Sequence, residues 1–476
     1  MSSIKLKLER LPPPLAPRPT FTALPDTSSP PRVISSSPVL SPLPAIVPSP
    51  ARSRASLSSS PALPPRPTLD NLRDRIAQIV GRSPAPVLRA DPTRGELPFI
   101  LERTDLGPLY VRRLQSPAGA RVGRAPLVGA RDADPALLAL LALDPRLAGC
   151  DPRRALYLDT ETTGLAGGTG TVPFLLGLAW FDPDTNTFML EQALLRRLGE
   201  EAPVLALLTE RIAQASMLVT YNGKAFDLPL LRTRYVMNRI PAPIEPPHLD
   251  LVHLARRVHR ARLKVRTLIA IENEVLGRAR IGDIAGEDIV AVYAHFLRTG
   301  DEEALFGVVE HNAADVLAMV ALVGLYGEPL GGLEPTDLAG VARTVLLGAR
   351  RAASAGPDRR LAPLESTLEL AAQLAEEAVA RGGGHVARRA RGDIAKTRGD
   401  KAAALADYEV IADEIDDPTV RLELAKLYEH HVRSFDQALA QVSRGTGEDP
   451  DAVDRRRLRL ERKIARRLEV PPRRPR

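Results

Sequence analysis

The chain of 476 residues is 44% hydrophobic and 4% aromatic, and its formal net charge is +7. Its length predicts two to four domains, and the scarcity of aromatic residues favours helices over an all-β fold. The single cysteine, Cys150, excludes a disulfide framework within the chain and a cysteine-based metal cluster.

Neither the N-terminus nor the hydropathy of the sequence indicates a membrane protein. The opening stretch MSSIKLKLERLPPPLAPRP lacks an apolar core of signal-peptide length. No window of the sequence approaches the roughly 20 apolar residues of a membrane span. Because cysteine is almost absent, a reducing compartment is the natural location. We therefore expect a soluble, cytoplasmic protein with no membrane partner.

The first 67 residues hold 17 of the 44 prolines, many serines and few acids. Such a segment cannot bury enough apolar surface to offset its ordering entropy, so we predict a disordered Pro/Ser-rich tail over 1–67. From Thr68, the apolar residues Leu72, Ile76 and Val80 have helical spacing. Short apolar runs mixed with Gly and Pro follow. We predict an N-terminal helix and an irregular extension over 68–150.

Residues 151–327 alternate between strand and helix patterns. The predicted strands are ALYLDTE, PFLLGLAWFD, TFMLEQALL and SMLVTYNG, and the predicted helices are EEAPVLALLTERIAQA, DLPLLRTRYVMNR and a last long one, EALFGVVEHNAADVLAMVALVGLYG. This order predicts an α/β domain with a central mixed sheet flanked by helices.

Residues 335–470 have a helical pattern throughout. The segments around Ala404-Leu405-Ala406 and Ala438-Leu439-Ala440 align at an offset of 34 residues, the period of tetratricopeptide-like helix pairs. The pattern predicts an all-α, tetratricopeptide-like domain; the alternative is an ordinary Ala-rich helical bundle.

The positive charge is concentrated at the C-terminal end, where residues 451–476 carry eleven basic and four acidic side chains. A basic balance suits a polyanionic partner such as nucleic acid. The base composition of the coding DNA explains an Arg-rich chain equally well. The C-terminal segment either contacts nucleic acid or is a solvated helix end.

Two carboxylates, Asp159 and Glu161, stand at the end of the first predicted strand of this domain. Side chains two residues apart on a strand share a face, so these acids would lie together and repel each other as they lose solvent. A hard cation such as Mg²⁺ or Mn²⁺ between them would relieve that repulsion. The alternative is a solvated strand end with two harmless acids.

Two further acids follow in later segments. Asp227 opens a helix after the turn at Asn222-Gly223, and Asn222 and Lys224 on that turn could meet a phosphate or a nucleotide sugar. An Asp at a helix start is also a common cap. His311 and Asp315 are four residues apart in the last helix and share a face.

Taken in order, the three motifs resemble those of the DEDD superfamily of 3′–5′ exonucleases, which have a ribonuclease-H-like fold. Asp159-Thr160-Glu161 matches the first motif, Asn222 with Phe226-Asp227 the second, and His311 with Asp315 the third. The strings LDTETTGLAGGTGT, TYNGKAFDLPLL and EHNAADV resemble bacterial ribonuclease-H-like domain proteins that often carry tetratricopeptide repeats. The similarity covers 150–327.

The resemblance implies a hydrolase with two divalent metal ions, Mg²⁺ or Mn²⁺, about 3.5–4 Å apart. It implies catalytic, metal-binding roles for Asp159, Glu161, Asp227 and Asp315, and substrate contacts for Thr160, Thr162, Asn222, Lys224 and Phe226. The spacing of His311 is that of the tyrosine branch, which leaves open whether His311 is a general base or only orients water. The substrate would be a single-stranded end of DNA or RNA, and the repeats would bind a protein partner. The alternatives are a non-catalytic module that binds nucleic-acid ends and a repeat scaffold.

Two other features allow more than one interpretation. The glycine-rich stretch GLAGGTGTVPF, residues 164–174, lacks the ending of a phosphate-binding P-loop. It is either a loop beside the metal site that lets a nucleotide approach the backbone or a flexible hairpin connection. Asp250 stands at another predicted strand end and could be purely structural.

Overall fold

The computed structural model describes residues 97–117, 119–164, 170–185, 187–354 and 364–469. The predicted tail, the predicted helix from Thr68 and the centre of the glycine-rich stretch lie outside these residues.

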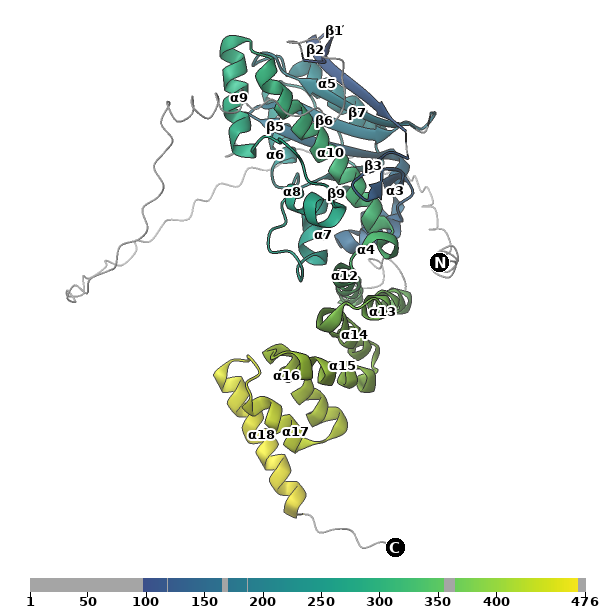
Figure 1. Ribbon diagram of the computed structural model, residues 1–476, viewed down its shortest axis with the longest axis vertical. Coiled ribbons are helices and arrows are strands. Elements are labelled where there is room, and N and C mark those ends of the chain that lie inside the picture. The colour runs from purple at the N-terminus through teal and green to yellow at the C-terminus, as the bar shows by residue number, and fades with distance from the viewer. Residues whose placement is uncertain (1–96, 118, 165–169, 186, 355–363, 470–476) are drawn as a thin grey trace, which may run out of the picture. The chain divides into compact units, whose positions relative to one another are not determined.

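A seven-stranded mixed sheet organises the α/β domain, with strand order β1-β2-β7-β6-β5-β8-β9 (Figure 1). Strands β5, β8 and β9 run parallel to one another. The neighbouring pairs β1–β2, β2–β7, β7–β6 and β6–β5 are antiparallel. The predicted fold, a mixed sheet flanked by helices and followed by a helical region, is therefore confirmed. The strands are β1 (Ile100–Thr104), β2 (Gly107–Ser116), β5 (Ala155–Thr162), β6 (Pro173–Phe181), β7 (Phe188–Leu194), β8 (Met217–Thr220) and β9 (His248–Asp250).

Residues 97–150 are more regular than the irregular extension that we expected. They supply the edge strands β1 and β2, a small hairpin of β3 (Arg121–Val122) and β4 (Ala125–Pro126), and the helices α3 (Val128–Arg131) and α4 (Pro135–Ala142). The register of β2 on β7 places Val111 opposite Ala193. Strand β2 also pairs with the adjacent β1, but β7 is some 80 residues away in sequence, so no local pattern could show that the β1–β2 pair belongs to the sheet.

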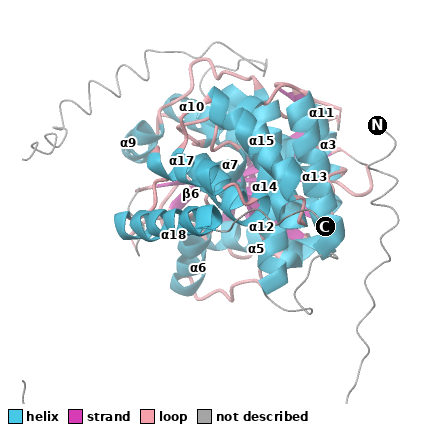
Figure 2. Cartoon of the chain, turned by 90° about the horizontal axis from the view of Figure 1, so that it is seen from below, coloured by secondary structure: helices cyan, strands magenta, loops and turns pink. Residues whose placement is uncertain are grey.

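Alternation along the strands separates two apolar cores, one on each face of the sheet. On β5, Ala155 and Tyr157 face one core, and Leu156 and Leu158 face the other. The first core contains α3, α4, α7 (Leu251–Val258) and most of α10 (Phe306–Gly327); the second contains α5 (Ala202–Gln214), α6 (Asp227–Met237), α9 (Gly286–Thr299) and the first turn of α10. Figure 2 distinguishes the helices from the strands by colour.

The long helix α10 is the central helix of the domain. Contrary to our expectation from the sequence, one helix among the described residues, Glu303–Gly327, is long and apolar enough to cross a membrane, but 78% of its most apolar 18-residue stretch is buried inside the protein. Val308, Val316 and Val320 are fully buried. The helix is therefore apolar because it packs against the sheet and its neighbours.

The C-terminal region is helical. It comprises α12 (Pro335–Ser354), α13 (Leu364–Ala380), α14 (Gly384–Arg398), α15 (Lys401–Glu414), α16 (Pro418–Leu427), α17 (Phe435–Ser443) and α18 (Pro450–Glu469). Helices α14 and α16 begin 34 residues apart, as do α15 and α17. Ala404 and Ala438, which occupy equivalent places, are both fully buried. The interval agrees with the repeat in the sequence; the tetratricopeptide assignment stays a prediction.

Helix α12 packs on the α/β domain although the sequence pattern placed it with the repeats. A Cβ on Gly340 would lie 2.0 Å from the Val258 carbonyl oxygen, so the two helices are in close contact. Asp337 accepts from Arg262 at 2.6 Å and pairs with His259 at 3.0 Å, where both His259 and Asp337 are buried. His259 also bonds Tyr326 at 2.9 Å, which assigns it a structural role.

Candidate active site

The first pair of acids lies where β5 leaves the core. Asp159 and Glu161 continue the face that begins with Ala155 and Tyr157, so they lie on the α10 side of the sheet. Asp159 is opposite Gly177 on β6, and the pairing shifts register just after Glu161. The two carboxylates therefore stand together at a strand end, as the spacing predicted.

Asp227 reaches the same place from the turn that follows β8. Asn222 has φ of 72°, a left-handed conformation, and the buried Asp250 carboxylate accepts the backbone N–H groups of Asn222 at 2.7 Å and Lys224 at 3.0 Å. The turn delivers Asp227 as the first residue of α6. The hydroxyl of Thr160, between the two acids of β5, donates to Asp227 Oδ1 at 2.5 Å. Asp250 is thus a structural acid that holds the turn.

Helix α10 contributes three polar side chains to the site, from two successive turns. His311 and Asn312 are buried, and Asp315 is partly exposed. His311 Nε2 lies 3.7 Å from Asp315 Oδ2, which confirms that the two side chains share a face. His311 Nδ1 lies 2.8 Å from Asp283 Oδ1, so one ring nitrogen is held by an acid outside the predicted motifs.

The acids lie near enough to one another for their charges to act on Asp159 and Glu161. Burial and the charges of Asp315 and Asp227 raise the pKa of Asp159 well above its usual value. Burial and the charges of Asp159, Asp315 and Asp227 do the same to the pKa of Glu161. Burial raises the pKa of Asp227 to about 6, although the hydrogen bond from Thr160 acts to lower this pKa. The hydrogen bonds from Thr160 to Asp227 and from Asn312 to Asp159 join β5, the start of α6 and α10 at one site.

A row of polar residues across the sheet fixes Asp159. Asn312 Nδ2 donates to Asp159 Oδ2 at 2.8 Å, and Gln192 Nε2 on β7 donates to Asn312 Oδ1 at 2.9 Å. Arg112 on β2 in turn donates to Gln192 Oε1 at 3.1 Å. Gly177 makes the row possible, because a Cβ there would lie 2.3 Å from Asn312 Oδ1.

A second cluster surrounds Asp315. Arg280, in the segment between the π-helical turn η3 (Glu272–Leu276) and α9, donates to Asp315 Oδ1 at 2.5 Å. The same guanidinium donates to Glu272 Oε2 at 2.6 Å and to Asp283 Oδ2 at 3.2 Å. Burial lowers the pKa of His311, but the hydrogen bond to Asp283 and the charge of Asp315 outweigh it, so the net shift is upward.

The predicted substrate contacts have different surroundings. Lys224 is exposed, and Phe226 is 59% exposed immediately before Asp227. Thr160 is bonded to Asp227, and Thr162 donates to the Gly164 carbonyl at 2.9 Å, so both hydroxyls serve the protein itself. Asn222 contributes through its backbone N–H and its left-handed conformation.

Sequence reasoning missed four residues of the site: Glu272, Arg280, Asp283 and Asn312. Asn312 lies within EHNAADV, next to His311 of the third motif, and this position could have marked it as a candidate site residue. The other three lie in a stretch whose Arg and Asp residues look like ordinary surface charges. Only their burial, with the Arg280 side chain 6% exposed and that of Glu272 0% exposed, distinguishes them.

The donor set fits divalent cations by its chemistry. All four predicted ligands are carboxylates that are only partly exposed to solvent, and the repulsion among them is what a hard cation would relieve. Within the described residues, no group of three or more His, Cys, Asp or Glu side chains has a geometry that could hold an ion as it stands. Asn312 holds one oxygen of Asp159, Thr160 holds one oxygen of Asp227, and Arg280 holds one oxygen of Asp315.

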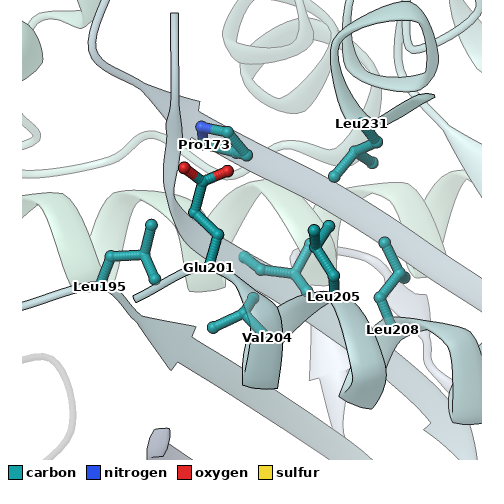
Figure 3. A pocket seen from close by; sticks show the side chains of 8 residues that line it. Pro173, Leu195, Glu201, Val204, Leu205, Leu208 and Leu231 are labelled. Atoms are coloured by element: carbon teal, nitrogen blue, oxygen red, sulfur yellow. The ribbon is translucent and has the colours of Figure 1, made fainter. Parts of the chain in front are cut away.

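A hollow between α5 and β6 is a poor candidate for a substrate site. Its lining is apolar apart from Glu201 (Figure 3) and consists of Pro173, Leu176, Leu195, Val204, Leu205, Leu208 and Leu231. Both Glu201 oxygens accept hydrogen bonds from Arg234 at 2.5 Å. The hollow contains none of the four clustered acids.

Residues 156–326 match the RNase_H_2 family model, which belongs to the RNase_H superfamily. This segment is therefore a ribonuclease-H-like domain, as the resemblance implied for 150–327.

Two known proteins are similar to parts of the chain. A Bacillus subtilis (strain 168) protein, Uncharacterized protein YprB, is 38% identical over 176 residues, which are 37% of this chain and 42% of that protein. The chain thus matches less than half of the length of this relative. The crystal structure of TTC0263, a thermophilic TPR protein of Thermus thermophilus, matches 37% of this chain and 90% of its own, at 20% identity and a TM-score of 0.23.

Proposed function

We propose that the ribonuclease-H-like domain is a metal-dependent nuclease that removes nucleotides from the 3′ end of single-stranded DNA or RNA. The observation that carries the proposal is the convergence of Asp159, Glu161, Asp227 and Asp315 at one partly buried site, where burial and the charges of the neighbouring acids raise the pKa values of Asp159 and Glu161. Protein interiors rarely keep such a cluster without a cation to balance it. The RNase_H superfamily match of residues 156–326 is consistent with a nuclease.

The four carboxylates would hold two divalent cations, Mg²⁺ or Mn²⁺, which when bound would lower the pKa of a water molecule and stabilise the leaving 3′ oxygen. Asn312 and Thr160 keep Asp159 and Asp227 in fixed orientations while leaving one oxygen of each for a ligand bond. Preorganisation of this kind avoids the cost of orienting the acids during the reaction.

His311 is the proposed acceptor of the water proton. Its Nδ1 is held by Asp283, so Nε2 is the nitrogen that faces Asp315 and the cluster. The hydrogen bond to Asp283 fixes the ring orientation and stabilises the protonated ring, as a general base requires. Outside the cluster, the exposed ring of Phe226 can stack on a terminal base, and Lys224 can contact a phosphate.

We further propose that the helical region binds a protein partner. Two successive helix pairs repeat at an interval of 34 residues. In repeat proteins, stacked helix pairs of this kind form extended surfaces that bind other proteins.

The proposal is tested with end-labelled single-stranded DNA and RNA, incubated with Mg²⁺, with Mn²⁺ and with chelator, beside the Asp159→Ala variant. The expected result is a ladder that shortens from the 3′ end and is absent in chelator and in the variant. Binding of the labelled ends without cleavage under all conditions would replace the nuclease with a non-catalytic end-binding module.

A further inference from the structure

Arg280 is a buried cation bound to one of the four clustered acids. Its side chain is 6% exposed, and it donates to Asp315 Oδ1 at 2.5 Å. Its other two partners, Glu272 and Asp283, lie outside the proposed ligand set. Although burial opposes it, the charges of Asp315 and Glu272 raise the pKa of Arg280, so the guanidinium keeps its charge.

The field of Arg280 reaches beyond Asp315. Its charge also lowers the pKa of Asp159, against the stronger upward effects of burial and of the neighbouring acids. A single guanidinium thus offsets part of the repulsion in the cluster. It does so at the position of one proposed metal ligand, and it takes one of the two Asp315 oxygens.

We propose that Arg280 is the internal counter-ion of the carboxylate cluster and that divalent cations bind to the cluster in competition with it. This inference rests on the proposed function, because it requires a metal site at the four carboxylates. A cation that approaches Asp315 must either share this carboxylate with Arg280 or displace the guanidinium onto Glu272 and Asp283. Glu272 and Asp283 can accept it, because each already bonds a separate guanidinium nitrogen.

The chain offers a matched control in Arg278. Arg278 pairs with Glu272 Oε1 at 3.0 Å, whereas Arg280 bonds Oε2 of the same carboxylate at 2.6 Å. The Arg278 side chain is 29% exposed, so its charge is better solvated than that of Arg280. Arg278→Gln therefore removes a cation from Glu272 while leaving the Arg280–Asp315 pair intact.

The test is the dissociation constant for Mn²⁺, measured by titration calorimetry on the full chain without nucleic acid. We expect Arg280→Gln to bind Mn²⁺ about tenfold more tightly or better, because removing a unit charge at contact distance is worth several RT inside a protein. Arg278→Gln should stay within about twofold of the original chain, because its partner Glu272 lies outside the proposed ligand set and its own charge is more solvated. An unchanged or weakened affinity of folded Arg280→Gln would overturn the inference.

A second variant covers the case in which Arg280→Gln does not fold. Arg280→Lys keeps the charge, but a compact ammonium cannot hold three carboxylates in the way that a planar guanidinium does. We expect its Mn²⁺ affinity to exceed that of the original chain by more than about twofold, and equal affinity would overturn the inference.

The same titration separates this inference from the proposed function. If the original chain binds Mn²⁺, Asp159→Ala abolishes the binding and Arg280→Gln changes nothing, the metal site stands and the role of Arg280 is wrong. If neither the original chain nor Arg280→Gln binds Mn²⁺, the metal-dependent function and the inference both fall.

Discussion

The contact between Gly177 and Asn312 leads to a prediction that links one methyl group to the proposed metal site. In Gly177→Ala, the new Cβ would lie 2.3 Å from Asn312 Oδ1 and 2.9 Å from Nδ2. Asn312 is fully buried and bonded to Gln192 and to Asp159, so its side chain has no free direction in which to move. The variant must therefore break these bonds or shift β6.

The magnitude follows from the two ways of accommodating the methyl group. Leaving buried hydrogen-bonding groups without partners costs about 1–3 kcal/mol per group. Forcing an extra methyl into a packed core costs about 1–3 kcal/mol. We expect Gly177→Ala to lower the free energy of unfolding by about 2–4 kcal/mol and to abolish cleavage, since Asp159 loses its donor. Urea unfolding and the 3′-end ladder measure the two effects.

A double-mutant cycle with Asn312→Ala identifies the cause. If the clash with Asn312 is the source, the double variant should be less destabilised than the sum of the single variants by about 1 kcal/mol or more. Gly149→Ala is the control, because a Cβ there meets nothing within 4 Å. Strictly additive effects, or a Gly177→Ala protein that cleaves normally, would refute the reasoning.

Three further predictions concern the acids and their neighbours. In chelator, the protein should lose stability as pH rises from about 4 towards 7, because the folded state keeps protons that the unfolded chain has released. The pKa of Asp227 rises from 3.8 to about 6 on folding, which sets this window. Urea unfolding at about pH 4 and about pH 7 should show this loss of unfolding free energy, on the order of 2 kcal/mol, and Asp227→Asn should reduce it. Asp250→Asn should lower the free energy of unfolding by about 1–3 kcal/mol and weaken Mn²⁺ binding. An amide has only one oxygen, so it cannot accept the N–H groups of both Asn222 and Lys224 as the carboxylate does. An unchanged Mn²⁺ affinity would show that this turn does not position the metal site. Asp337→Asn should cost about 3–5 kcal/mol of unfolding free energy, because it leaves the buried His259 and the partly buried Arg262 without their carboxylate. The exposed Glu334→Gln should cost under about 1 kcal/mol. Equal shifts in melting temperature for the two variants would show that α12 is not part of the domain core.

The sequence by itself determined the local elements and the order of the acids. A period of two placed Asp159 and Glu161 on one face of β5, helical spacing placed His311 and Asp315 on one face of α10, and a turn followed by a helix start placed Asp227. These relations involve residues within a few positions of each other. Backbone geometry fixes them before any long-range contact forms, which is why they could be predicted.

Only the tertiary structure decided which side chains complete the site. Asn312 reaches Asp159 over 153 residues of sequence, and Arg280 reaches Asp315 over 35. Such contacts depend on the register of the strands and on how α10 lies across them, so no local period predicts them. The same holds for β2, which joins the sheet through β7, and for α12, which packs on α7. In each case the partner is distant in sequence, and only packing of the whole domain brings the two together.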